Sequence, residues 1–172
     1  GTCLVGSEMC IRDSIRDSLD RKILFNNEYE DQQLSFLYTN LNKLNISHFI
    51  DVGANMGIYS LLIANRFNDM KIYSFEPHPG VFKRFKKNIE QNSLNKNIQA
   101  MELGLSDKKD LMFIEGPKHF GINQSGGASL QSKGSHKVDV STGDKEISLV
   151  GKNIAIKIDV EGHEAKTLSG FK

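Results

Sequence analysis

"FIDVGANMGIYS", residues Phe49–Ser60, decides the fold class of this chain of 172 residues. An apolar run ends at Asp51, and two glycines, Gly53 and Gly57, follow four positions apart. Gly53 would let the backbone leave a strand with positive φ at no steric cost. Gly57 stands where a helix would begin, and it would let a ligand or a strand approach closely. The apolar residues after Gly57 recur mostly at helical spacing. The stretch therefore predicts a strand, a tight glycine turn and a helix.

The alternation of strand and helix continues along the chain. Residues 70–77 and 97–107 are predicted strands, and residues 79–92 between them form a helix with a buried stripe. Residues 153–164 contain a further strand, which runs into a helix over residues 162–170. This order predicts an α/β fold, a Rossmann-like parallel sheet with helices on both faces. The carboxyl ends of the strands would share one edge, where such sheets bind ligands.

The remaining segments are less regular. Residues 20–45 form an N-terminal helical segment with one apolar face, and residues 111–116 are a further short strand. Residues 116–143 are rich in Gly, Ser, Lys, His and Asn, which predicts a loop or an irregular hairpin. Residues 1–19 are a leader that repeats Ile-Arg-Asp-Ser in tandem and resembles translated adapter sequence rather than a secretory signal. We therefore expect the core domain over residues 46–172.

The composition excludes several classes of protein. Hydrophobic residues make up 38% and charged residues 25%, as in ordinary soluble domains. A net charge of +1 gives no electrostatic case for a nucleic acid or an anionic membrane as partner. No apolar run approaches the ~18 residues of a membrane helix. The two cysteines, Cys3 and Cys10, fit neither a zinc site nor a disulfide framework, so we expect a cytoplasmic protein; its oligomeric state stays open.

Acidic residues follow three of the predicted strands, at Asp51, Glu76 and Asp159. Glu76 ends the second strand, where a carboxylate can accept hydrogen bonds from both hydroxyls of a ribose. The dinucleotide fingerprint Gly-x-Gly-x-x-Gly fails, because Asn55 and Ile58 stand at its second and third glycine positions. The turn lacks the dense glycines that bring a backbone against a pyrophosphate, but we expect an acid, Asp51, to face it. That acid favours a cationic or hydroxyl-rich ligand over a phosphate.

The stretch "IKIDVEGHE" carries Asp159, Glu161, His163 and Glu164 within six positions. Such a cluster could supply acid–base catalysis or hold a metal, although the spacing does not support a metal site. Alternatively, the two glutamates only complement the dipole of the next helix. Lys157, inside the same predicted strand, needs either a charged partner or a route to solvent.

Taken together, these motifs resemble an FkbM-type S-adenosylmethionine-dependent methyltransferase. The matching pieces are "FIDVGANMGIYS", "IYSFEPHPGVFKRFKKNIEQN", "LGLSD", "GGASL" and "IKIDVEGHEAKTLSG", which lie within residues 49–170. The resemblance implies a class I methyltransferase that uses S-adenosyl-L-methionine to methylate oxygen on small molecules or sugars. Because the sequence stops after the helix that follows "IKIDVEG", we expect the core to lack the last strands of that fold.

The resemblance also assigns roles to residues. The first loop would lie near the methionine part of the cofactor, Glu76 near its ribose, and the residues after the third strand near its adenine. The candidate cofactor-binding residues are Asp51, Gly53, Asn55, Met56, Gly57, Glu76, Ser106 and Asp107. The candidate general bases are Asp159, Glu161 and His163. Two alternatives remain: a nucleotide-dependent oxidoreductase of Rossmann type and a non-catalytic fragment.

Overall fold

The computed structural model describes residues 2–3, 10–11, 31–115, 118–119, 122–123 and 129–172. Its centre is a four-stranded sheet in the order β12-β3-β4-β5, in which every pair is parallel. The strands are β3 (His48–Val52), β4 (Lys71–Phe75), β5 (Ile98–Met101) and β12 (Ile154–Ile158). The predicted parallel α/β sheet is confirmed.

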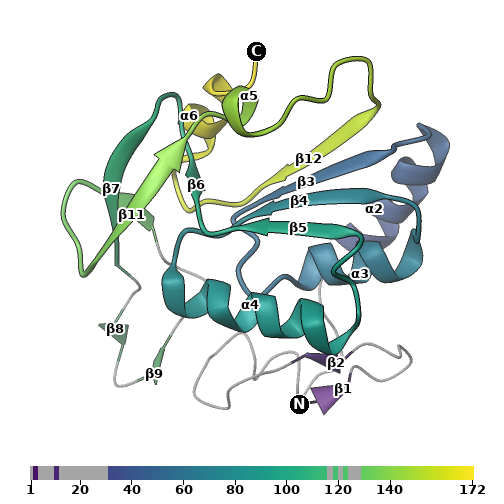
Figure 1. Ribbon diagram of the computed structural model, residues 1–172, viewed down its shortest axis with the longest axis horizontal. Coiled ribbons are helices and arrows are strands. Elements are labelled where there is room, and N and C mark those ends of the chain that lie inside the picture. Colours follow the sequence, from purple (N-terminus) through teal and green to yellow (C-terminus); the bar gives the residue numbers. More distant parts are fainter. Residues whose placement is uncertain (1, 4–9, 12–30, 116–117, 120–121, 124–128) are drawn as a thin grey trace.

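Helices cover both faces of this sheet (Figure 1). On one face lie α2 (Asp31–Lys43), α3 (Ile58–Arg66) and α4 (Pro79–Gln91). On the other lie the short helices α5 (Gly143–Glu146) and α6 (Glu164–Ser169). The chain runs from β3 through β4 to β5 in one direction, and β12 then joins the opposite side of β3. This reversal of strand order creates a crevice beyond the carboxyl ends of β3 and β12, where open α/β sheets bind ligands.

Two apolar clusters hold the sheet between its helices. Phe49 of β3 and Ile72 of β4 lie opposite each other on neighbouring strands. Both point toward α3 and α4 and pack with Leu61 and Phe85 of these helices. The intervening strand positions point to the other face, where the buried residues are Ile50, Val52, Phe75, Leu105 and Ile147. Burial on both faces explains why Phe49, Ile50 and Val52 of β3 are all apolar although they point to opposite faces, as expected for an inner parallel strand.

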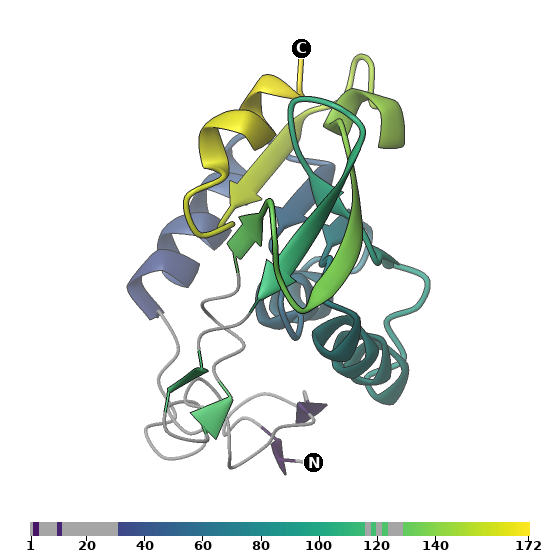
Figure 2. The ribbon, with the colours of Figure 1, turned by 90° about the vertical axis from the view of Figure 1, so that its left-hand side faces the viewer.

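A second sheet lies at the carboxyl ends of the parallel strands and corrects two predictions (Figure 2). Its order is β10-β7-β11-β6, with β6 at Gly104–Leu105, β7 at Asp110–Glu115, β10 at Ser129–Gln131 and β11 at His136–Ser141. The predicted strand 97–107 is therefore two strands in different sheets. The segment 116–143, predicted as a loop or an irregular hairpin, contains the six-residue strand β11, whose alternate residues Val138 and Val140 are buried although polar residues lie beside them.

The predicted N-terminal segments are only partly described. Helix α2 occupies the C-terminal part of the predicted helical segment 20–45. Of the predicted leader, residues 2–3 and 10–11 form the short pair β1 (Thr2–Cys3) and β2 (Cys10–Ile11), and the rest lies outside the described residues. A similar pair joins β8 (Lys118–His119) to β9 (Ile122–Asn123). None of the described helices is long and apolar enough to cross a membrane.

Candidate functional site

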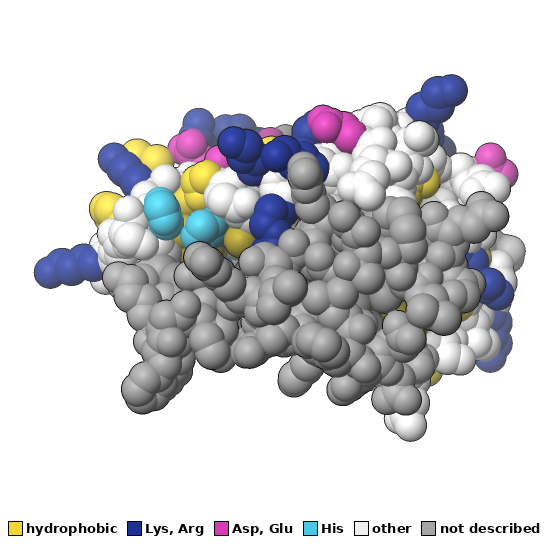
Figure 3. Space-filling model, turned by 90° about the horizontal axis from the view of Figure 1, so that it is seen from below, with side chains coloured by type: hydrophobic (Ala, Val, Ile, Leu, Met, Phe, Trp, Pro, Cys, Tyr) yellow, Lys and Arg dark blue, Asp and Glu magenta, His cyan; other side chains and the backbone are white. Residues whose placement is uncertain are grey.

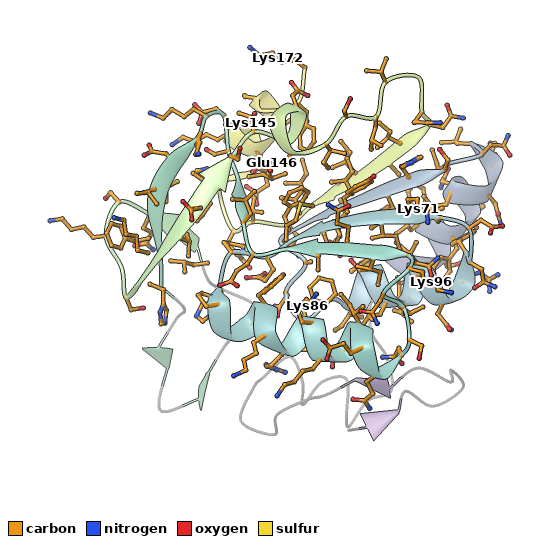
Figure 4. The ribbon with its side chains drawn as sticks, viewed as in Figure 1. Lys71, Lys86, Lys96, Lys145, Glu146 and Lys172 are labelled. Atoms are coloured by element: carbon orange, nitrogen blue, oxygen red, sulfur yellow. The ribbon has the colours of Figure 1, made fainter. Side chains whose placement is uncertain are left out.

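A pocket lies at the carboxyl ends of the parallel strands, between the central sheet and the second sheet. Gly53, Glu76 and Asp159, from three different strand ends, all line it. The other lining residues are Val52, Phe75, Pro77, Leu103, Gly104, Leu105, Ile114, Leu130 and Val160. Three of the sequence-predicted site residues thus share one pocket. Lys71 and Lys96 lie at the opposite end of the sheet, a full strand length away (Figure 4).

The two glycines of the first turn are required for different reasons. Gly53 has a φ of +77°, and a Cβ there would overlap the carbonyl oxygen of Asp159, so the first turn packs directly on the end of β12. Gly57 has a φ of +90°, and a Cβ there would overlap the ring of Phe85 on α4. We expected Gly57 to allow the approach of a ligand or a strand. Instead, it allows two helices to pack closely.

The backbone amides of residues 53–57 are all hydrogen-bonded within the protein. The first two donate to the carbonyl oxygen of Phe75, at 3.0 and 2.9 Å. The amide of Asn55 donates to a carboxylate oxygen of Glu76 at 2.9 Å, and the last two donate within the loop itself at 2.8 Å. The loop is therefore a fixed wall of the pocket, held to the end of β4.

Glu76 is the acid that faces this pocket. Its side chain is buried, and its two carboxylate oxygens accept hydrogen bonds from the amides of Asn55 and His78, at 2.9 and 2.8 Å. Burial raises the pKa of Glu76 to about 7, although the two amide bonds act in the opposite direction. A carboxylate has about four acceptor positions, so each oxygen retains one for a further donor such as a ribose hydroxyl.

Asp51, by contrast, does not face the pocket. Its residue is fully buried under α3, and its carboxylate accepts a 2.6 Å hydrogen bond from the hydroxyl of Ser60. The ammonium group of Lys157 lies 3.3 Å from its other oxygen. The expectation that Asp51 faces the turn is therefore wrong. The charge of Asp51 is therefore paired within the protein, with Lys157.

The side chains of the next loop residues also point away from the pocket. Met56 has no exposed surface and belongs to the core beneath α3 and α4. Asn55 has a φ of +53° and turns its side-chain oxygen back to the amide of Met56, at 2.8 Å. The expectation that Met56 lines the cofactor site can therefore apply only to its backbone, because its side chain lies in the core.

Ser106 and His163 lie together, but outside the pocket. The hydroxyl of Ser106 is 2.9 Å from Nε2 of His163 and 2.9 Å from a carboxylate oxygen of the exposed Asp107. Burial lowers the pKa of the His163 imidazole, and the charge of Lys166 lowers it further. Since Thr167 also donates to the carbonyl of Leu105 at 2.9 Å, these contacts fasten α6 to the end of β6.

The acids after β12 have different surroundings. Asp159 lines the pocket, and its carboxylate lies 3.6 Å from the ammonium of Lys157. Glu161 is exposed, with a φ of +48°, in the turn that follows. Glu164 accepts a hydrogen bond from the amide of Gly162 at 3.1 Å in the first turn of α6, as expected for an acid that complements a helix dipole. Of these three acids, Asp159 is the one that lines the pocket.

Sequence reasoning missed two ring contacts near the site. The ammonium of Lys157 lies 5.0 Å from the ring centre of Tyr59, which had been counted only as part of a helical run. His78 and His136 have ring centres 4.9 Å apart. Figure 3 shows two adjoining histidine side chains on the face that it presents. Among the described residues, no three His, Cys, Asp or Glu side chains are grouped so that they could hold a metal.

A comparison with models of protein families identifies the family of this chain. The family described as "Methyltransferase FkbM domain" matches residues 51–172, which is more than half of the chain. The chain belongs to the FkbM methyltransferase family. The match begins at Asp51 and includes the first turn, the pocket acids and the β12–α6 segment.

The FkbM chain also resembles individual methyltransferases. It is 30% identical over 124 residues to "Hexuronic acid methyltransferase AglP" of Haloferax volcanii. The matched region covers 70% of this chain and 48% of that protein. It is 28% identical over 115 residues to "Methyltransferase sdnD" of Sordaria araneosa. Here the matched region covers 65% of this chain and 43% of that protein. The chain thus spans about half the length of the curated relatives that it matches.

Among solved structures, one neighbour is the N-terminal domain of human METTL16 in complex with SAH, with a TM-score of 0.36 and 26% identity. It covers 40% of this chain and 29% of that one. A second is the human methyltransferase 10 domain containing protein, with a TM-score of 0.39 and 24% identity over 44% and 40% of the two chains.

Proposed function

We propose that this FkbM-family chain is an S-adenosylmethionine-dependent methyltransferase that methylates a hydroxyl oxygen on a small molecule or sugar. The observation that carries the proposal is the pocket at the reversal of strand order. Gly53, Glu76 and Asp159 line it from three strand ends, where this class of sheet binds ligands. The family membership supports the same chemistry.

Glu76 fits the ribose of such a cofactor. Its carboxylate is fixed by two backbone amides and keeps acceptor positions for two hydroxyl groups. Helix α3 begins at Gly57 without a side-chain cap, so the first amides of this helix could receive the carboxylate of the methionine part. We propose Gly53, Asn55, Gly57 and Glu76 as the residues that shape the cofactor site. Asp51 and Met56 support this site from within the core.

When bound, S-adenosyl-L-methionine supplies an activated methyl group. The protein then has to orient the acceptor hydroxyl and take up its proton. Asp159 lines the pocket, and Glu161 lies in the exposed turn beside it, so these two carboxylates are our candidates for the general base. His163 is buried against Ser106, and we therefore propose that it positions α6.

We propose a sugar or sugar-like acceptor. The name of one relative specifies a hexuronic acid as its substrate, and that relative is 30% identical to this chain. The exposed carboxylates of Asp159 and Glu161 can accept hydrogen bonds from the hydroxyls of such a molecule. The net charge of +1 gives no reason to propose a nucleic acid as acceptor.

Transfer of tritium from methyl-labelled S-adenosylmethionine tests the proposal. The acceptors would be a neutral hexoside, a hexuronate, a simple alcohol and an RNA oligonucleotide. We expect label on a sugar hydroxyl, stable to mild base because the product is an ether, and loss of most transfer in Glu76→Ala. Base-labile label would show that a carboxylate is methylated instead. Label on the RNA alone, or on none of the acceptors, would contradict the proposal.

A further inference from the structure

Lys157 is a half-buried cation between two carboxylates. Its ammonium nitrogen lies 3.3 Å from Oδ1 of Asp51 and 3.6 Å from Oδ2 of Asp159. It also lies 5.0 Å from the ring centre of Tyr59, which is suitable for a cation–π contact. The two carboxylates differ sharply in their exposure to solvent. Only 1% of the Asp51 side chain is exposed, compared with 67% of the Asp159 side chain. Lys157 therefore joins a buried acid to a surface acid.

We call the two ion pairs Asp51–Lys157 and Lys157–Asp159 the bridge. Its buried end at Asp51 continues into a network of hydroxyl groups. Asp51 accepts the 2.6 Å bond from Ser60 on α3, and Ser60 in turn lies 2.8 Å from the hydroxyl of Ser74 on β4. Burial alone would lower the pKa of Lys157, but the charges of Asp51 and Asp159 outweigh it and raise the pKa above its usual value. Lys157 is therefore a fixed cation, which suits an electrostatic anchor and not a general base.

The bridge lies beside two loops that touch each other. We define the cofactor loop as residues 53–57 and the acceptor loop as residues 159–163. A Cβ at Gly53 would overlap the carbonyl oxygen of Asp159, and the amide of Asp159 donates to the carbonyl of Val52 at 3.0 Å. The loops are thus in backbone contact, and the bridge connects Asp51, two residues before the cofactor loop, to Asp159 in the acceptor loop.

We infer that Lys157 is a positioning residue that couples the order of the cofactor loop to that of the acceptor loop. The names of the two loops rest on the proposed function, but the coupling is a property of the protein without ligands. If the bridge is broken at Asp159, the ammonium loses its surface partner, and the cofactor loop should open more often. Lys157→Arg keeps the charge and should preserve most of the coupling.

Hydrogen exchange measured by mass spectrometry tests this inference, because the amides of the cofactor loop are all hydrogen-bonded. The test variant is Asp159→Asn, and the matched control is Glu161→Gln, which removes the same charge two residues away. We expect exchange in residues 53–57 to accelerate at least about fivefold in Asp159→Asn and to stay unchanged in Glu161→Gln. Lys157→Arg should resemble the wild type, which a loss of packing alone would not explain.

Three results would overturn the inference. In the first, Asp159→Asn changes exchange only in residues 157–163. In the second, Glu161→Gln accelerates hydrogen exchange in the cofactor loop as much as Asp159→Asn does. The effect would then come from the loss of any nearby charge and not from the bridge. In the third, the double variant Asp51→Asn/Lys157→Met, which removes the buried charge pair together, leaves the cofactor loop as protected as in the wild type. If this double variant does not fold, Asp159→Asn decides, because its side chain is mostly exposed.

A second measurement separates this inference from the proposed function. S-adenosylhomocysteine should slow exchange in the cofactor loop and, through the bridge, also in the acceptor loop. If the compound does not bind, the proposed function fails, while the comparison of variants without ligand still tests the bridge. Protection of the cofactor loop alone would contradict the coupling.

Discussion

The charge of Glu76 should make the folded protein less stable as the pH rises, which is the reverse of the usual behaviour of a paired carboxylate. Burial raises the pKa of Glu76 from 4.5 to about 7 in the folded state. Between these values the folded protein holds a proton that the unfolded chain has already released. The free energy of unfolding therefore falls as the pH rises through this window, and it levels off above about pH 7.

The size of the effect follows from the two pKa values of Glu76. With 4.5 in the unfolded chain and about 7 in the folded protein, linkage gives a loss of about 2.5 kcal/mol between pH 5 and pH 8. Glu76→Gln carries no titratable proton, so this contribution should be absent. The variant starts less stable, because an amide cannot accept hydrogen bonds from both backbone amides with equal geometry. Only the pH dependence is therefore compared.

Urea unfolding at several pH values between 5 and 8 measures this difference. Burial lowers the pKa of both His78 and His163 in either protein, so the contribution of these histidines cancels when the two pH profiles are subtracted. We expect the wild type to lose about 2.5 kcal/mol relative to Glu76→Gln across this range. Parallel profiles would show that Glu76 is ionised throughout and would refute the argument that burial governs its charge.

Three further variants have expected outcomes. Gly57→Ala should cost about 2–4 kcal/mol of stability in urea melts, because the new Cβ meets Phe85 at a positive φ. Gly151→Ala is its control, since it has a φ of +72° but open space around it, and a cost above about 1.5 kcal/mol there would undermine the comparison. Met56→Leu should cost less than about 1.5 kcal/mol and leave the affinity for S-adenosylhomocysteine unchanged in calorimetry, whereas a large loss of affinity would place its side chain at the ligand. Ser106→Ala should cost about 1–3 kcal/mol in thermal unfolding, because the buried His163 nitrogen loses its partner; an unchanged melting temperature would argue against that contact.

The parallel sheet and the location of the pocket could be predicted from sequence, because they depend on local patterns. The glycine turn after an apolar strand and Glu76 at the next strand end are both short-range signals. Alternating strands and helices then fix which strand ends meet. Gly53, Glu76 and Asp159 accordingly line one pocket.

The partners of individual side chains could not be predicted in this way. Asp51 and Lys157 are 106 residues apart, and only the pairing of β3 with β12 brings them together. The pairing of Ser106 with His163 depends likewise on how α6 packs against the end of β6. The resemblance implies that Met56 lies near the cofactor, but the direction of its side chain is set by the packing of α3 against α4.

The second sheet escaped prediction for a different reason. Strand β11 alternates buried valines with lysine, aspartate and histidine, and its neighbours are rich in glycine and serine. Such a strand has one buried face, so its apolar signal covers only alternate positions. Composition over residues 116–143 obscured this short alternation. The result is that one wall of the pocket, which includes Ile114 and Leu130, was missing from the sequence-based picture.

Binding of S-adenosylhomocysteine, measured by isothermal titration calorimetry at two temperatures, tests the central claim most directly. We predict saturable binding to the wild type, at least about tenfold weaker binding to Glu76→Ala because charge-assisted hydrogen bonds are lost, and unchanged binding to the exposed control Glu90→Ala. No binding to the wild type at millimolar ligand, or equal binding to the wild type and Glu76→Ala, would contradict a cofactor site at the ends of β3, β4 and β12.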